Sequence, residues 1–388
     1  MREMPVGYYD FSEDTGLNFQ LNRFYSIGAI GYDELMEIGH KVTSFEVWIQ
    51  LFTELAEKAE AQGDFLRAAI CYRAAQFYTL GDAKDKEGND LKKVLYEKCR
   101  ENYDKYYGEI ETLKYTRVPY KEGYLPVYYV KPVGAAEKKM GTIVIHGGYD
   151  SFVQEFLEVL LYFAELGYEV YFFEGPGQGE VLIRCGMQMT HKWEECTSAV
   201  LDYFQLQDIT LIGISLGGYL ATRAAAYDSR ITRLVMYDLI YDFYGSLTAK
   251  MGRRKARLFD YLTAHPKNIL WKWLEKKFDD YYFLRWLLRQ GYAIYENVHT
   301  PCEYFNHIKK YNTREISSMI KQDTLVLAGA ADIYTIYYED QLKALCNARS
   351  VTGRLFTAEE SADHHCQIGN MKLVLNTIET WIRTKTNG

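Results

Sequence analysis

Residues 206–227, LQDITLIGISLGGYLATRAAAY, decide the fold of this chain. Residues 209–212 form a short apolar run that is typical of a buried strand. The pentapeptide GISLG follows at residues 213–217, and then an alanine-rich stretch that favours a helix. A strand, a sharp turn and a helix in this order are the setting of a nucleophile elbow, so we predict that Ser215 is a nucleophile. The alternative is a Gly/Ser turn that merely joins two packed elements.

Strand and helix patterns alternate around this stretch, which predicts a mainly parallel, doubly wound sheet of the α/β class. Residues 112–120 and 124–130 flank a short glycine-containing turn and predict an antiparallel hairpin at one edge. The expected parallel strands are residues 142–145, 169–173, 209–212, 234–237, 324–328 and 355–356. The expected helices between and after them are residues 156–166, 193–204, 219–226, 337–345 and 371–383.

Two helical parts are expected beside this catalytic domain of residues 109–388. Residues 1–108 predict an N-terminal helical domain, with Ser44 as a helix N-cap, and it serves either as a packed module or as a lid. Residues 245–317 interrupt the strand–helix alternation and carry aromatic residues at helical spacing. We predict a helical cap over Ser215 there, while the plainer interpretation is that these aromatics only pack the insertion's own helices.

A serine hydroxyl needs a base within hydrogen-bond reach, and that base needs an orienting acid. With an elbow serine, the expected chain order is serine, acid, histidine. Asp332 comes directly after the expected strand 324–328, where catalytic groups collect, although it could simply cap the next helix. The histidine should follow the last strand, where His364 and His365 are adjacent, and the loop position alone does not choose between them.

The oxyanion of an acyl-transfer reaction needs two N–H donors. The first expected donor is the backbone N–H of Leu216, directly after the nucleophile. The second is Gly148 or Tyr149, because the glycine-rich loop there leaves the first core strand and lets backbone approach a substrate closely. His146 is expected to be a structural hydrogen-bonding residue at the strand end and not the base.

Neither a cofactor nor a metal is expected. Residues 174–180, EGPGQGE, lack the dinucleotide spacing and an expected helix at the last glycine, so they are interpreted as a tight loop bordering the site. The adjacent histidines His364 and His365 have no obvious third ligand for an ion. The seven cysteines form no C-x-x-C pair, which argues against a disulfide framework or a zinc site and favours the cytoplasm.

The overall charge limits the expected partners. A net charge of −7 without a long basic run argues against nucleic acid and membranes as main partners. The N-terminus has no apolar core of signal-peptide length, and no run of about 18 apolar residues occurs. The expected partner is a small-molecule or short-peptide acyl substrate, and homo-oligomerisation is left open.

Three stretches resemble the α/β-hydrolase superfamily: residues 147–151 (GGYDS), 174–180 (EGPGQGE) and 365–369 (HCQIG). Within it they are similar to the prolyl-oligopeptidase-like branch, near 2,6-dihydropseudooxynicotine hydrolase and the polyketide-shortening hydrolases. The resemblance implies that the histidine before Cys-Gln, His365, is the triad base. It also matches Ser215 and Asp332 with the nucleophile and the acid.

The sequence therefore predicts a serine hydrolase that cleaves an ester, an amide or a short blocked peptide, in the manner of an esterase or acylaminoacyl peptidase. One alternative keeps the triad and cleaves a carbon–carbon bond beside a ketone, because that branch includes such enzymes. A second alternative, of another class, is a catalytically silent protein that binds a small molecule.

Overall fold

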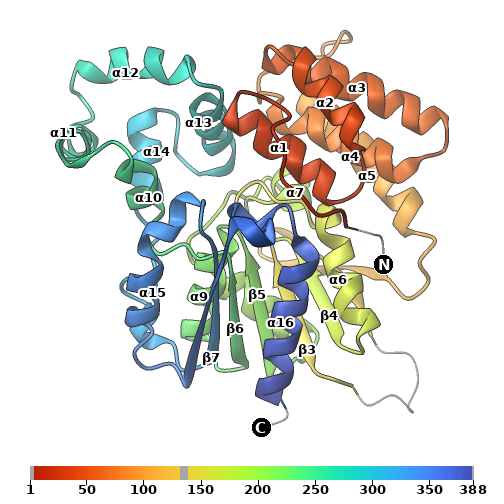
Figure 1. Ribbon diagram of the computed structural model, residues 1–388, viewed down its shortest axis with the longest axis vertical. Helices are drawn as coiled ribbons and strands as arrows, with labels where there is room; N and C mark the ends of the chain where they lie inside the picture. The colour runs from red at the N-terminus through yellow and green to blue at the C-terminus, as the bar shows by residue number, and fades with distance from the viewer. Residues whose placement is uncertain (1–3, 132–138, 387–388) are drawn as a thin grey trace.

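The computed structural model describes residues 4–131 and 139–386 of the chain, and an eight-stranded sheet lies at its centre (Figure 1). The strand order is β1-β2-β4-β3-β5-β6-β7-β8. The strands are β1 (Lys114–Tyr120), β2 (Gly123–Val130), β3 (Thr142–His146), β4 (Glu169–Phe173), β5 (Ile209–Ile214), β6 (Ile231–Tyr237), β7 (Asp323–Gly329) and β8 (Ser350–Phe356).

The sheet is parallel from β4 to β8, and β2 runs antiparallel to both β1 and β4. The predicted parallel sheet with an antiparallel hairpin at one edge is therefore confirmed. In a parallel sheet the carboxyl ends of all strands point to the same edge. That edge faces the helical layer at the top of Figure 1.

Helices cover both faces of the sheet because successive strand residues point to opposite sides. Ile143 and Ile145 pack with α6 (Leu157–Glu165) and α16 (Met371–Thr386), whereas Val144 packs with the helices of the other face. The remaining helices beside the sheet are α7 (Gly179–Cys185), α8 (Glu194–Tyr203), α9 (Gly217–Tyr227) and α15 (Tyr338–Ala344).

Five helices precede the first strand in the described chain: α1 (Thr15–Ser26), α2 (Tyr32–Lys41), α3 (Phe45–Ala61), α4 (Phe65–Tyr78) and α5 (Leu91–Tyr107). Ser44 caps α3 as expected, since its side chain accepts a hydrogen bond from the N–H of Val47. The helices α1 and α2 were not predicted individually. The Asp14 carboxylate begins α1 by accepting from two backbone N–H groups.

A second group of helices is inserted between β6 and β7: α10 (Phe243–Ala249), α11 (Arg253–Ala264), α12 (Leu270–Asp279), α13 (Tyr282–Ile294) and α14 (Pro301–Ile308). We call these the inserted helices. They lie beside the N-terminal helices above the same edge of the sheet (Figure 1). No helix in the described part of the chain combines the length and the apolar character that a membrane span requires.

One expectation about the loop at residues 174–180 is wrong, because α7 begins at its last glycine, Gly179. The helix starts there because the N–H of Glu180 donates to the buried Glu174 carboxylate at 2.7 Å. A Cβ atom on Gly179 would lie 2.2 Å from the same carboxylate, so only glycine allows this close approach.

A buried arginine ties the N-terminal helices to the loop after β3. Arg73 of α4 is 1% exposed and donates to the carbonyl of Asp150 at 2.7 Å. Its Nε lies 3.2 Å from the carboxylate of Glu155. Its loss would leave the buried Asp150 carboxylate without its ion-pair partner at 3.5 Å, and would leave Glu155 paired with Arg23 alone.

We expect Arg73→Ala to lower the free energy of unfolding by about 3–5 kcal/mol, the usual cost of breaking a buried ion pair. Arg67→Ala on the same helix is the matched control, because its pair with Glu34 is partly exposed and should contribute about 1 kcal/mol or less. Urea denaturation measures both values. Equal losses in the two variants would show that Arg73 does not hold the two parts together.

Candidate active site

Ser215 lies at the sharp turn between β5 and α9, as the elbow prediction requires. Its φ of 63° is left-handed, which is uncommon for a residue with a side chain. Its N–H donates to the carbonyl of Tyr237 at 2.6 Å, which holds the turn against β6. A Cβ atom on Gly213 would lie 2.0 Å from the carbonyl oxygen of Gly217, so the turn can close only with glycine at position 213.

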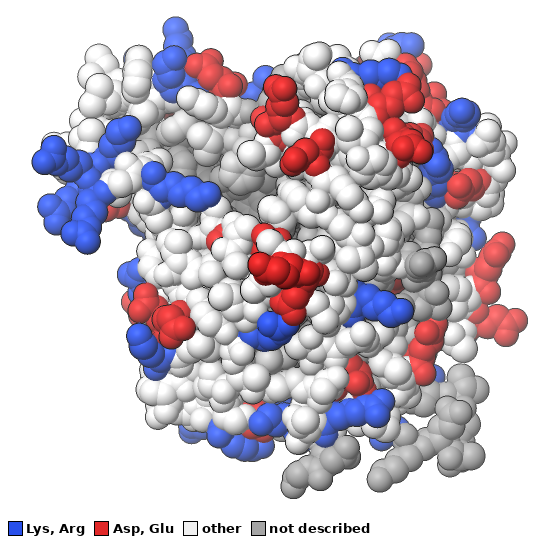
Figure 2. Space-filling model, in the orientation of Figure 1, with Lys and Arg blue, Asp and Glu red and all other residues white. Residues whose placement is uncertain are grey.

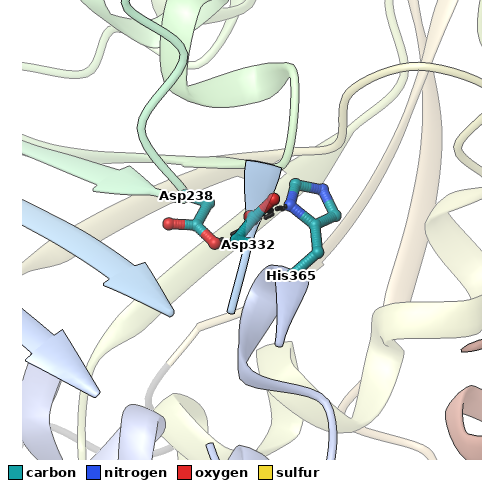
Figure 3. Close-up of side chains that lie close together, drawn as sticks. All are labelled: Asp238, Asp332 and His365. Atoms are coloured by element: carbon teal, nitrogen blue, oxygen red, sulfur yellow. Dashed lines mark hydrogen bonds and ion pairs between the residues drawn. The ribbon is translucent and has the colours of Figure 1, made fainter. Parts of the chain in front are cut away.

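The structure brings Ser215, His365 and Asp332 into one hydrogen-bonded chain. Ser215 Oγ lies 2.7 Å from His365 Nε2, and His365 Nδ1 lies 2.5 Å from Asp332 Oδ2. Figure 3 shows the Asp332 carboxylate facing the imidazole. Asp332 follows β7, and His365 begins the 3₁₀ turn His365–Gln367 after β8. The alternative role of Asp332 also holds, because its side chain accepts from Tyr334 N at 3.3 Å and caps the turn Ile333–Tyr337.

Burial and charge have opposite effects on the pKa values of His365 and Asp332. Burial alone would lower the pKa of His365, but the negative charge of Asp332 and its hydrogen bond raise the pKa well above 6.5. Burial likewise works against ionisation of Asp332, yet His365 holds the pKa of that carboxyl below its usual value. The pair is therefore arranged to stabilise an imidazolium beside a carboxylate.

The neighbouring His364 points elsewhere. Its ring stacks on Tyr8 with the ring centroids 3.5 Å apart, and its Nε2 lies 4.0 Å from Asp363. Of the two adjacent histidines, His365 is thus the one in contact with Ser215.

The predicted oxyanion donors lie together beside Ser215. A Cβ atom on Gly148 would lie 2.6 Å from the backbone N of Leu216, so the glycine loop and the elbow touch. Within the described residues, no hydrogen bond occupies the backbone N–H of Leu216, Gly148 or Tyr149. The side chain of Tyr149 donates to the carbonyl of Leu287 in α13 at 2.9 Å, which ties this loop to the inserted helices.

Gln178 holds the glycine loop in place and was not among the predicted residues. Its Nε2 donates to the carbonyl of Gly148 at 2.9 Å, and its Oε1 accepts from Gly175 N at 3.0 Å. The loop at residues 174–180 therefore borders the site, as expected, and also orients the backbone beside Ser215. The glutamine within a glycine-rich loop was the only sequence signal for this role.

His146 is buried at the end of β3 and is separate from this chain of contacts. Burial lowers its pKa to about 4, although a bond from its Nδ1 to the carbonyl of Gly147 at 2.9 Å works in the opposite direction. The ring is therefore neutral at ordinary pH and forms a structural hydrogen bond.

Asp238 is a further acid of the site that the sequence did not point to. It follows β6 directly, and its Oδ2 lies 3.7 Å from His365 Nδ1 (Figure 3). The rule that placed Asp332 after one strand would have found Asp238 one strand earlier. Asp238, Asp332 and His365 offer ligand atoms within 4.8 Å of one another, as a metal site could. Both ring nitrogens of His365 are, however, engaged by Ser215 and Asp332.

These residues open into a cavity of about 680 Å³. One wall comes from α1 and α4, and the other from the inserted helices. The two walls meet where Trp286 stacks on Phe77 with ring centroids 4.5 Å apart and donates to its carbonyl at 3.0 Å. On the face shown in Figure 2, the surface between these two groups of helices is hollowed and mainly uncharged.

Residues 143–366 match the sequence profile described as the alpha/beta hydrolase family. The chain belongs to this family. The fold predicted for it, an α/β-hydrolase sheet, is the one observed, and the chain is that of a hydrolase.

Relatives of this α/β hydrolase include Hydrolase acrC of Aspergillus aculeatus, 29% identical over 74% of this chain and 75% of the relative. The 20-hydroxy-prefusarin hydrolase FUS2 of Gibberella moniliformis is 28% identical over 81% of this chain and 77% of its own length. The crystal structure of 2,6-dihydroxy-pseudo-oxynicotine hydrolase superposes with a TM-score of 0.64 at 20% identity, covering 93% of this chain and 94% of that one. The last likeness shows that the two chains share a fold over nearly their whole length.

The two adjacent histidines give a direct test of the site. We expect His365→Ala to lose activity on p-nitrophenyl esters by about 10³-fold or more, because it removes the imidazole that is hydrogen-bonded to Ser215. His364→Ala should cost about tenfold at most, through loss of the Tyr8 stack. Steady-state kinetics of the two variants side by side decides this, and the reverse order of losses would contradict it.

Proposed function

We propose that this α/β hydrolase is a serine hydrolase that works through an acyl-enzyme on Ser215. The observation that carries the proposal is the hydrogen-bonded chain from Ser215 Oγ through His365 to Asp332. A nucleophile, a base and an orienting acid in mutual contact are what acyl transfer needs.

In the first half of the reaction, Ser215 Oγ attacks the substrate carbonyl while His365 Nε2 takes the hydroxyl proton. Asp332 stays ionised and stabilises the imidazolium through Nδ1. The free N–H groups of Leu216 and of Gly148 or Tyr149 donate to the developing oxyanion. His365 then gives its proton to the leaving group, and the carbon–heteroatom bond breaks.

In the second half, water replaces the leaving group. His365 takes a proton from this water, and the resulting hydroxide attacks the acyl carbonyl. The intermediate collapses as the proton passes from His365 to Ser215 Oγ, which releases the acid and restores the enzyme.

The cavity supports a small or medium, mainly apolar acyl substrate. Its walls carry many aromatic side chains, among them Phe19, Phe77 and Trp286. Aromatic walls bind flat apolar groups by burying apolar surface and by ring–ring contacts. An ester, an amide or a short blocked peptide with an apolar acyl group fits this lining.

A carbon–carbon hydrolase is the second candidate, because the same three residues can attack a ketone and the apolar lining suits an uncharged diketone. A panel of p-nitrophenyl esters, aminoacyl amides and β-diketones separates these bond types. Binding without turnover of any panel member would favour the silent binding protein instead.

Ser215→Ala should lower kcat by about 10³-fold or more without changing the fold, because it removes the nucleophile and adds no bulk. The measurement is kcat on the best panel substrate, with circular dichroism as the control for folding. Retained turnover by the folded variant would reject the acyl-enzyme mechanism.

The acid limb of the kcat/KM profile should lie at higher pH than an unperturbed histidine would give. The base must be neutral to accept a proton, and Asp332 raises the pKa of His365 above 6.5, so kcat/KM is lost as the pH falls through that raised pKa. We expect the midpoint of the acid limb of kcat/KM to lie above pH 6.5. An acid limb at or below this value would contradict the proposed charge state of the pair.

A further inference from the structure

Asp238 and Asp332 form a pair of buried carboxyls behind one imidazole. The strands β6 and β7 are parallel neighbours, so the residues that follow them emerge side by side at the same edge of the sheet. Asp238 is 1% exposed, and its carboxyl and that of Asp332 lie within 4.8 Å of each other. Two like charges so close in a buried site cannot both be present without a large cost.

Among the described residues, one imidazole is the cation for both carboxyls. In the part of the chain that the structure describes, His365 is the sole basic group within ion-pair distance of Asp238. The other titratable groups near Asp238 are the carboxyl of Asp332, the thiol of Cys366 and the phenols of Tyr237 and Tyr334. Charge balance with one imidazolium therefore favours one carboxylate and one neutral acid.

Of the two carboxyls, Asp238 is the one that carries the proton. Burial first, and then the charge of Asp332, raise the pKa of Asp238 well above its usual value, although the charge of His365 and the N–H bond from Cys366 act against this. A hydrogen bond between the two carboxyls raises the pKa of Asp238 and lowers that of Asp332. Asp238 is then the donor, and Asp332 keeps the negative charge that faces His365.

Asp238 also holds the segment that carries the imidazole. Its Oδ2 accepts from the N–H of Cys366 and from Nε2 of Gln367, both at 3.1 Å. Its Oδ1 accepts from Leu239 N at 3.1 Å. These contacts join the end of β6 to the two residues directly after His365, so the position of the ring depends on Asp238 as well as on Asp332.

We propose that Asp238 is a positioning residue that shares one proton with Asp332, anchors the His365 segment, and becomes the carboxylate behind His365 when Asp332 cannot be charged. This role rests on the proposed serine hydrolase function. Asp238 Oδ2 lies 3.7 Å from His365 Nδ1. Asp238 therefore acts through His365 and has no direct part in the attack on substrate.

The test is a double-mutant cycle of Asp332→Asn, Asp238→Asn and the double variant in the full chain. Asp332→Asn should lose about 10²-fold in kcat/KM, because Asp238 then gives up its proton and supplies the charge. Asp238→Asn should stay within about threefold of the wild type, because the amide is neutral, as the protonated acid is, and its oxygen can still accept from Cys366 N. The double variant, with no carboxylate left, should lose about 10⁴-fold, the cost known for a triad acid changed to its amide.

The non-additive loss is a signature that a purely structural role would not produce. Additive losses, or an Asp332→Asn variant already 10⁴-fold impaired and unchanged by the second substitution, would overturn the proposal. Asp363→Asn is the matched control, since this acid lies in the same loop, its carboxylate is 4.0 Å from His364 Nε2, and its loss should leave kcat/KM unchanged. Thermal unfolding of each variant verifies that it is folded.

The pH profile of Asp238→Asn tests the shared proton separately. If Asp238 is neutral in the wild type, the Asp238→Asn substitution does not change the midpoint of the acid limb of kcat/KM. A limb moved to lower pH would mean that the substitution removed a negative charge beside His365, which would overturn the proton assignment. Failure of the serine mechanism is distinguishable, because it would appear as turnover by Ser215→Ala and not in this cycle.

Discussion

The two hydrogen bonds of His365 are the interaction on which the rest of the site depends. They join residues that follow three different strands, so they form only if β5, β7 and β8 are in register in one parallel sheet. The strained turn at Ser215 is then held by neighbouring backbone, through the bond from its N–H to Tyr237. The sheet fixes the positions of the Ser215, Asp332 and His365 side chains more firmly than loops alone could.

Buried charge gives this arrangement its chemical character. The site places one imidazole against two acids, and burial makes each unpaired charge expensive while it strengthens the attraction within the pair. The outcome is a histidine that holds a proton readily and an acid that stays ionised beside it. Around this centre, α1 and α4 meet the inserted helices through Trp286 and Phe77, which encloses the cavity above Ser215.

Much of the fold and the places of Ser215 and Asp332 could be predicted from chain order and hydrophobic period, whereas His365 was chosen over His364 by the family resemblance. The strands around the sheet are short apolar runs; Ser215 and Asp332 come shortly after two of them, and His365 lies further along the loop that follows β8. The helices α1 and α2 lacked a comparable pattern, since buried Asn18 and Asn22 occupy inner positions of α1. The strand-end rule also indicates the position of Asp238, but its role and that of Gln178 depend on contacts across the fold, with the His365 segment and with Gly148.

The central claim is that Ser215 is the nucleophile, and covalent trapping tests it most directly. The protein would be treated with a fluorophosphonate, digested, and its peptides measured by mass spectrometry. We predict one added phosphonyl group, on the peptide that contains Ser215, with loss of hydrolysis in proportion to labelling. Complete inhibition with the label on another residue, or full activity in protein labelled at Ser215, would contradict the claim.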